Sequence, residues 1–236
     1  MHIAIIETGA PPEQLARDYP SYPKMMERML SPHAPGFSYS TYRVFEDGAL
    51  PRVSDFDGLL ITGSAFGVYE DHAWLAPLET LIRDTAAAGK PQVGICFGHQ
   101  LMAQAFGGAV KKSDKGWGLG VHRYDVGGRA DWMQPAQGKI SCIVVHQDQV
   151  IDPPPGAVNL AGSEFCEYGV LAYAQGPAIS FQMHPEFSHE YVRDLLKLRR
   201  QRYGEALVDN ADATLARGSD RELMGRWISN FFKSAG

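Results

Sequence analysis

The sequence is poor in cysteine, in long apolar runs and in basic charge, and each shortage excludes a class of protein. Its three cysteines form neither an even-numbered disulfide framework nor a C-x-x-C pair, so we expect reduced thiols. No apolar run reaches the length of a membrane span, and the start MHIAIIETG lacks the charged region of a signal peptide. We therefore expect a cytoplasmic protein that does not associate with membranes.

The net charge limits the kinds of partner to expect, and the chain length limits the number of domains. A net charge of −5 provides no basic excess for nucleic acid, so small molecules are the expected partners. With 44% hydrophobic and 21% charged residues among 236, the chain can bury a substantial core. We predict one domain over residues 1–190 and a C-terminal helical extension of the same domain over residues 191–236.

Strand-like and helix-like segments alternate in the first half of the chain. Apolar or aromatic runs at 2–8, 37–45 and 56–62 predict strands, and apolar residues at helical spacing predict a helix over 74–88. The proline-rich segment 10–36 predicts a loop with one short helix around Met25. This alternation predicts a three-layer α/β/α sandwich with a flavodoxin-like, mostly parallel sheet and a site at the carboxyl ends of the strands.

The second half of the chain looks richer in strands. Runs at 117–126, 139–145, 167–174 and 178–183 lie between glycine- and proline-rich turns, which is typical of strands. The tail, residues 188–236, predicts two helices, one around Leu195 and one around Trp227. We expect the apolar face of the second to cover the sheet or to form a homodimer contact.

The segment PQVGICFGHQLMAQAFGG, residues 91–108, predicts a nucleophile elbow, in which a strand turns sharply into a helix and one side chain projects from the bend. Gly94 and Gly98 lack a Cβ, so the two backbones can approach each other on either side of Cys96. The helix start favours a thiolate at Cys96, and the N–H of Phe97 is free to bind an oxyanion. A buried structural cysteine at a strand-helix junction remains an alternative.

A thiolate nucleophile needs a base, and a carboxylate to orient that base. In AISFQMHPEF, His184 and Glu186 follow an apolar strand, and Pro185 between them restricts the local backbone. Both side chains can therefore face one edge of the sheet. The motif alone is also consistent with a solvent-exposed turn.

Together, GICFGHQ and QMHPEF resemble the class I glutamine amidotransferases, a family with a Cys-His-Glu triad, and most resemble stand-alone members similar to the glutaminase domain of GMP synthase. The resemblance implies that Gly63, in LLITGSAFGVYED, supplies a second oxyanion N–H. It also implies a set of substrate-binding residues on the elbow helix and in VVHQDQV, residues 144–150. That set is Gln100, His146, Gln147 and Asp148, with the backbone of the last two meeting the amino-acid end of the substrate.

The resemblance implies that Cys96 attacks the γ-amide of glutamine, forms a γ-glutamyl thioester, and releases glutamate and ammonia. It also implies an ammonia-accepting synthetase subunit as a partner, and neither a metal nor an organic cofactor. A hydrolase of γ-glutamyl peptides or conjugates would use the same triad. A non-catalytic binding or regulatory module of the same fold is a third alternative, which the intact triad argues against.

Several other conspicuous residues are better explained by structure. His99 lies on a different helical face from Cys96, and Cys142 and Cys166 lie in or near apolar strands, so packing is the expected role of all three. Trp117 in GWGLG is expected to pack in the core rather than line a pocket. The basic run KLRRQRY, residues 197–203, is expected to form a solvated helix face rather than an anion site.

Overall fold

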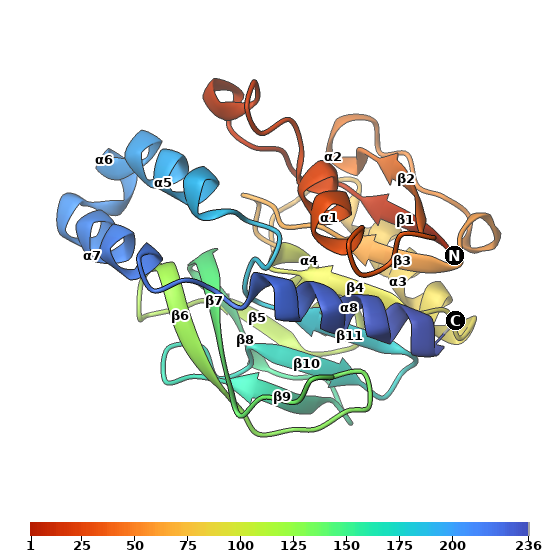
Figure 1. The fold of residues 1–236 in the computed structure, drawn as a ribbon. Coiled ribbons are helices and arrows are strands. Elements are labelled where there is room, and N and C mark those ends of the chain that lie inside the picture. The colour runs from red at the N-terminus through yellow and green to blue at the C-terminus, as the bar shows by residue number, and fades with distance from the viewer. Residues whose placement is uncertain (236) are drawn as a thin grey trace.

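The computed structural model describes residues 1–235, and within them nine strands form one mixed sheet in the order β2-β1-β3-β4-β11-β10-β9-β6-β7 (Figure 1). The first five strands pair in parallel, and the others pair antiparallel. The parallel strands are β2 (Ser38–Tyr42), β1 (His2–Ile6), β3 (Gly58–Ile61), β4 (Gln92–Ile95) and β11 (Ala178–Phe181). The antiparallel strands are β10 (Val170–Tyr173), β9 (Val158–Gly162), β6 (Gly118–Val126) and β7 (Lys139–His146).

Helices cover both faces of the parallel part of the sheet, which confirms the predicted three-layer sandwich. One face carries α1 (Tyr22–Leu30) and α8 (Arg221–Ala235), and the other carries α3 (Leu75–Ala87) and α4 (Phe97–Ala105) (Figure 1). Alternate residues of β1 enter the two cores: Ile3 and Ile5 belong to the same cluster as Trp227 of α8, and Ile6 to that of α3. This division follows from the alternation of side chains along a strand.

Other short elements lie outside these layers. They are α2 (Val44–Asp47), the 3₁₀ turns Glu13–Leu15 and Val53–Asp55, and a separate antiparallel pair of β5 (Ala109–Lys112) with β8 (Asp148–Asp152). Segment 144–150 is therefore not one strand, because β7 ends at His146 and β8 begins at Asp148. Within residues 1–235, no helix is both long enough and apolar enough to cross a bilayer.

Residues 188–235 contain four helices: the two predicted around Leu195 and Trp227 are present, but two more were not predicted. Between α5 (His189–Leu198) and α8 lie α6 (Arg200–Tyr203) and α7 (Glu205–Leu215), separated by Gly204 with φ +87°. Only three residues of α7 are buried, Val208, Ala211 and Leu215, and so weak an apolar pattern is easily missed. Helix α7 packs on β6, where the hydroxyl of Thr214 accepts a hydrogen bond from the N–H of Val121 at 2.7 Å.

Helix α8 covers the sheet, as one of the two sequence alternatives expected. Trp227 and Phe232 are fully buried within the chain, and the indole N–H of Trp227 donates to the carbonyl of Pro135 at 3.1 Å. A homodimer through another surface stays a prediction, as does the boundary between 1–190 and 191–236. The last position of the predicted extension, Gly236, lies outside the described residues.

Candidate active site

Cys96 lies at the turn between β4 and α4, where the sequence predicts a nucleophile elbow. Its φ is +51°, and among residues 1–235 no other non-glycine residue has a positive φ. The backbone is held there because the Cys96 N–H donates to the carbonyl of Phe181 at 2.8 Å, while the Cys96 carbonyl accepts from Gln100 N–H at 3.0 Å. A non-glycine residue in this sparsely populated region is strained, and such strain is found mostly at functional sites.

The two glycines of the elbow allow close contact between backbones. A Cβ added to Gly98 would lie 2.5 Å from the carbonyl oxygen of Ile61, at the end of β3. A Cβ on Gly94 would lie 2.6 Å from both the carbonyl carbon of Gly98 and the sulfur of Met102. Since real Cβ atoms do not come this close to other heavy atoms, both positions require glycine for the geometry observed.

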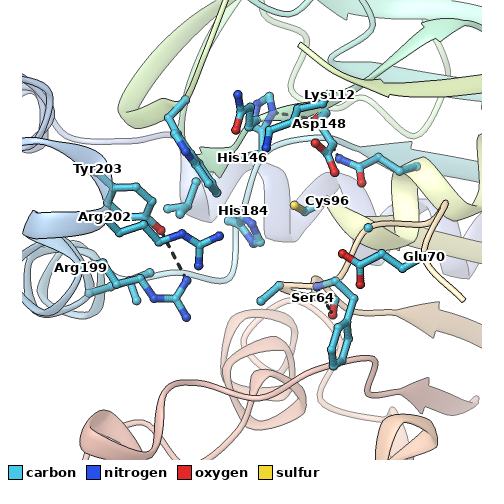
Figure 2. A pocket seen from close by; sticks show the side chains of 18 of the residues that line it. Ser64, Glu70, Cys96, Lys112, His146, Asp148, His184, Arg199, Arg202 and Tyr203 are labelled. Atoms are coloured by element: carbon cyan, nitrogen blue, oxygen red, sulfur yellow. Dashed lines mark hydrogen bonds between the residues drawn. The ribbon is translucent and has the colours of Figure 1, made fainter. Parts of the chain in front are cut away.

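His184 and Glu186 lie beyond the end of β11 and form a buried pair. Figure 2 shows His184 beside Cys96. The His184 Nδ1 and the Glu186 Oε1 are 2.8 Å apart, and the two side chains are 5% and 0% exposed. The imidazole also stacks on the ring of Phe187, with centroids 4.0 Å apart. The imidazole orientation is therefore fixed by a carboxylate on one nitrogen and by an aromatic ring on one face.

The surroundings of His184 favour its charged form. Burial, the largest single influence, lowers the pKa of His184, but the charges of Cys96 and Glu186 and hydrogen bonding to both outweigh it. The net effect raises the pKa of His184 above its usual range. The arrangement thus favours the imidazolium form of His184.

Two backbone N–H groups flank the cysteine as the sequence suggests. Gly63, which follows β3, is so near the pair that an added Cβ would lie 2.7 Å from His184 Cε1 and 3.6 Å from Cys96 Cβ. Phe97 is the first residue of α4. Among the hydrogen bonds formed by residues 1–235, none uses the N–H of Gly63 or of Phe97. Both donors are thus available to a ligand at the elbow.

The substrate-binding residues inferred from the resemblance lie on one pocket with Cys96 and His184. The Gln100 amide donates to the carbonyl of Asp148 at 2.9 Å and to Gln182 Oε1 at 3.1 Å. Both hydrogens of its amide nitrogen are therefore used in bonds within the protein. His146 Nδ1 also lies 3.1 Å from the Asp148 carbonyl, and burial lowers the pKa of His146 to about 3. Two side chains thus fix the backbone at Asp148, while Gln147 lines the pocket beside it.

The pocket contains charged residues that the sequence analysis did not assign to it. Glu70, Lys112, Arg199 and Arg202 all line it, together with Trp117 and Tyr203. The expectation of a purely solvated face for residues 197–203 was therefore wrong for three of them, because Arg199, after α5, and Arg202 and Tyr203, in α6, face the site (Figure 2). Glu70 lies within the segment LLITGSAFGVYED, residues 59–71. The expectation that Trp117 packs in the core rather than lines a pocket was also wrong, because its partly exposed ring lines the site.

The remaining conspicuous residues lie away from the pocket lining. His99 is buried, and its Nδ1 lies 2.7 Å from the Ser180 hydroxyl. Cys142 and Cys166 are 1% exposed, and burial raises the pKa of both thiols. These positions agree with the packing roles expected for them. Within residues 1–235, no group of three or more His, Cys, Asp or Glu side chains is arranged to hold a metal ion.

The size of the pocket favours a small ligand. Its volume is about 170 Å³, below the ~300–1,000 Å³ typical of sites for drug-sized molecules. The lining combines one nucleophile with carboxylates, cations and aromatic rings. Such a site can attack an electrophilic carbon and stabilise an oxyanion while binding a small charged molecule.

Comparison with known proteins places the chain in a family. Residues 36–197 match the family model for class I glutamine amidotransferases. A glutamine amidotransferase-like protein of Schizosaccharomyces pombe is 30% identical over 84% of each chain. Gamma-glutamyl peptidase 5 of Arabidopsis thaliana is 29% identical over 84% of this chain and 82% of its own. GMP synthase of Vibrio vulnificus is 25% identical over 72% of this chain and 34% of its own.

Solved structures agree with the sequence comparisons. A glutamine amidotransferase of Thermotoga maritima superposes with a TM-score of 0.76 at 17% identity, covering 99% of this chain and 96% of that one. At this identity the likeness shows the fold, a flavodoxin-like α/β architecture. The sequence match over residues 36–197 shows the descent. The chain therefore belongs to the class I glutamine amidotransferase family.

Proposed function

We propose that the protein hydrolyses the γ-amide bond of glutamine or of another γ-glutamyl compound, with Cys96 as the nucleophile. The observation that carries the proposal is a backbone-strained Cys96 that shares one pocket with His184, whose imidazole pairs with the buried Glu186. The combination of a nucleophile, a base and an orienting carboxylate is the general arrangement for acyl transfer. Family membership supports the same reaction class.

In the first half of the proposed reaction, the Cys96 thiolate forms a C–S bond to the γ-carbonyl carbon. The N–H groups of Gly63 and Phe97 hold the negative oxygen of the tetrahedral intermediate. His184, charged beforehand, gives its proton to the nitrogen as the C–N bond breaks, so ammonia or an amine leaves neutral. Glu186 keeps the imidazole oriented throughout.

In the second half, water attacks the γ-glutamyl thioester, and His184 accepts its proton. The C–S bond breaks, the thiolate returns to Cys96, and glutamate leaves. The His184–Glu186 pair is thereby restored to an imidazolium and a carboxylate. This chemistry is complete with the residues of the pocket and water.

The identity of the leaving group separates two candidate substrates. Glutamine would release ammonia, which a synthetase subunit could accept, and the name of the GMP synthase relative supports this route. The names of the γ-glutamyl peptidase relatives support a peptide or conjugate instead. The partner subunit and the non-catalytic alternative both stay predictions that activity measurements address.

The test is a hydrolysis assay on purified protein with glutamine and γ-glutamyl dipeptides, read as release of ammonia or amine. Cys96→Ala is expected to lower kcat by about 10³-fold or more, as loss of the nucleophile does in analogous triads. Cys142→Ala, at an equally free but structural thiol, should retain activity. Turnover that survives Cys96→Ala, or no turnover and no covalent γ-glutamyl adduct on wild-type protein, would reject the proposal.

A further inference from the structure

The tail of the chain places two arginines on the pocket wall. Arg199 follows the last residue of α5, Arg202 lies in α6, and both line the pocket together with Cys96 and His184 (Figure 2). Taking the proposed hydrolysis as given, we infer that Arg199 and Arg202 form a subsite for a carboxylate on the leaving group. The substrate class is then a γ-glutamyl peptide with a free carboxylate.

The first support is that neither arginine is neutralised by the protein. Among residues 1–235, Arg199 and Arg202 form no ion pair, whereas their neighbours Arg193 and Arg200 pair with Asp212 and Asp209. Arg199 is half-buried and its guanidinium contacts only a neutral partner, the Tyr203 hydroxyl at 3.5 Å. Since arginine stays charged at any physiological pH, the two side chains present unpaired positive charge to the pocket.

The second support is that aromatic rings hold these side chains in place. The guanidinium of Arg202 lies 5.2 Å from the ring centroid of Trp117. Trp117 in turn meets Tyr203 edge to face, with centroids 4.8 Å apart. A guanidinium that is already oriented loses less conformational freedom when it binds a carboxylate, and its planar fork suits two parallel hydrogen bonds.

The third support is the position of the arginines relative to the reacting atoms. Figure 2 shows His184 between Cys96 and the two arginines, while Glu70, Lys112 and Asp148 lie on the other side of Cys96. Because His184 must reach the departing nitrogen, the leaving group lies on the arginine side. The opposite side offers charges of both signs, which suits the ammonium and carboxylate of a glutamyl group.

The chemistry of the leaving group then distinguishes substrates. Ammonia released from glutamine carries no carboxylate that could pair with an arginine. An amino acid or short peptide joined through its amine to the γ-carbonyl ends in a carboxylate, which can form charge-assisted hydrogen bonds to a guanidinium. The arginine subsite therefore favours γ-glutamyl peptides over glutamine and over neutral amides.

The test compares γ-glutamylglycine with γ-glutamylglycinamide, which differ only in the charge of the leaving group. Wild-type protein is expected to show a kcat/KM about tenfold or more higher for the acid. Arg199→Gln combined with Arg202→Gln should bring this ratio close to one, mainly by slowing the acid. Lys197→Gln removes the same charge from an exposed position of α5 and should keep the wild-type ratio.

The ratio is measured on a single preparation of each variant, so a partly unfolded variant does not change it. A ratio near one in wild type, or an unchanged ratio in the arginine variant, overturns the subsite. Either result is what we would expect if the arginines bound only a protein partner and not the substrate. Failure of the proposed function is distinct, because then neither compound is hydrolysed, or Cys96→Ala hydrolyses both at the wild-type rate.

Discussion

The side chains of Cys96, His184 and Glu186 show how neighbouring groups can keep a buried imidazole charged although burial itself disfavours the charge. A lone buried imidazole is normally neutral, and burial does lower the pKa of His146 to about 3 in the same pocket. His184 differs because it has a carboxylate on one side and the cysteine on the other. Two nearby histidines therefore have opposite charge states, and only His184 is suited to donate a proton to a leaving group.

The first prediction concerns Glu186→Gln, which keeps the side-chain shape and removes the charge. The change should lower the pKa of His184, because a carboxylate that stabilises the imidazolium is lost. The alkaline limb of the kcat/KM profile should therefore move to lower pH, and kcat should fall by about 10² to 10⁴-fold. The measurement is a pH-rate profile with a γ-glutamyl substrate.

Glu190→Gln is the matched control, since Glu190 is an exposed glutamate in the first turn of α5. It should leave both the rate and the profile as in wild type. An alkaline limb that stays in place in Glu186→Gln would mean that Glu186 does not set the protonation of His184.

At the residue scale, the sequence predicted the positions of those reactive side chains that directly follow a predicted strand. Cys96 and His184 each follow a recognisable strand, and the carboxyl ends of neighbouring parallel strands meet at one edge, so their proximity could be predicted. Arg199 and Arg202 could not, because nothing in a basic run reports which side faces the pocket. Lys112 is a similar case, since β5 pairs with a strand 36 or more residues further along the chain.

At the scale of elements, the elbow depends on close contact between three of them. Strand β3, strand β4 and helix α4 approach within the space that Gly94 and Gly98 leave open. The pattern of glycines predicted the close approach of β4 and α4, whereas the contact between Gly98 and Ile61 of β3 was not predicted. The tail was predicted less well, because α7 presents a weak apolar face and its place against β6 depends on tertiary contacts.

The second prediction is that Gly98→Ala disturbs both the fold and the site. The new Cβ would lie 2.5 Å from the Ile61 carbonyl, so β3 and α4 must move apart. Overpacking of this kind costs about 1–3 kcal/mol of unfolding free energy, and a displaced Phe97 N–H should also lower kcat/KM. Urea denaturation and the hydrolysis assay measure the two effects.

Gly127→Ala provides the comparison, because a Cβ there meets no heavy atom within 4 Å. Its unfolding free energy should stay within about 0.5 kcal/mol of wild type. Equal stability of the two variants would show that the elbow tolerates a side chain at residue 98 and does not depend on the backbone contact.

At the scale of the whole molecule, stability should depend on pH through histidines that the fold keeps neutral. Burial lowers the pKa of His99 and of His146 to about 3, against about 6.5 in an unfolded chain. Between these values the unfolded state binds protons that the folded state does not. The unfolding free energy should therefore fall as the pH falls, by up to about 1.4 kcal/mol per pH unit for each histidine.

The third prediction isolates one of these groups with His99→Gln, whose amide can still reach the Ser180 hydroxyl. Between pH 7.5 and pH 5, the wild type should lose about 2 kcal/mol more unfolding free energy than the variant, measured by urea denaturation at both values. His184, whose pKa is raised, contributes equally to both proteins, so its effect cancels. An identical loss of unfolding free energy in wild type and His99→Gln would contradict this prediction. It would mean that His99 is protonated within the folded protein, despite the burial of its side chain on α4.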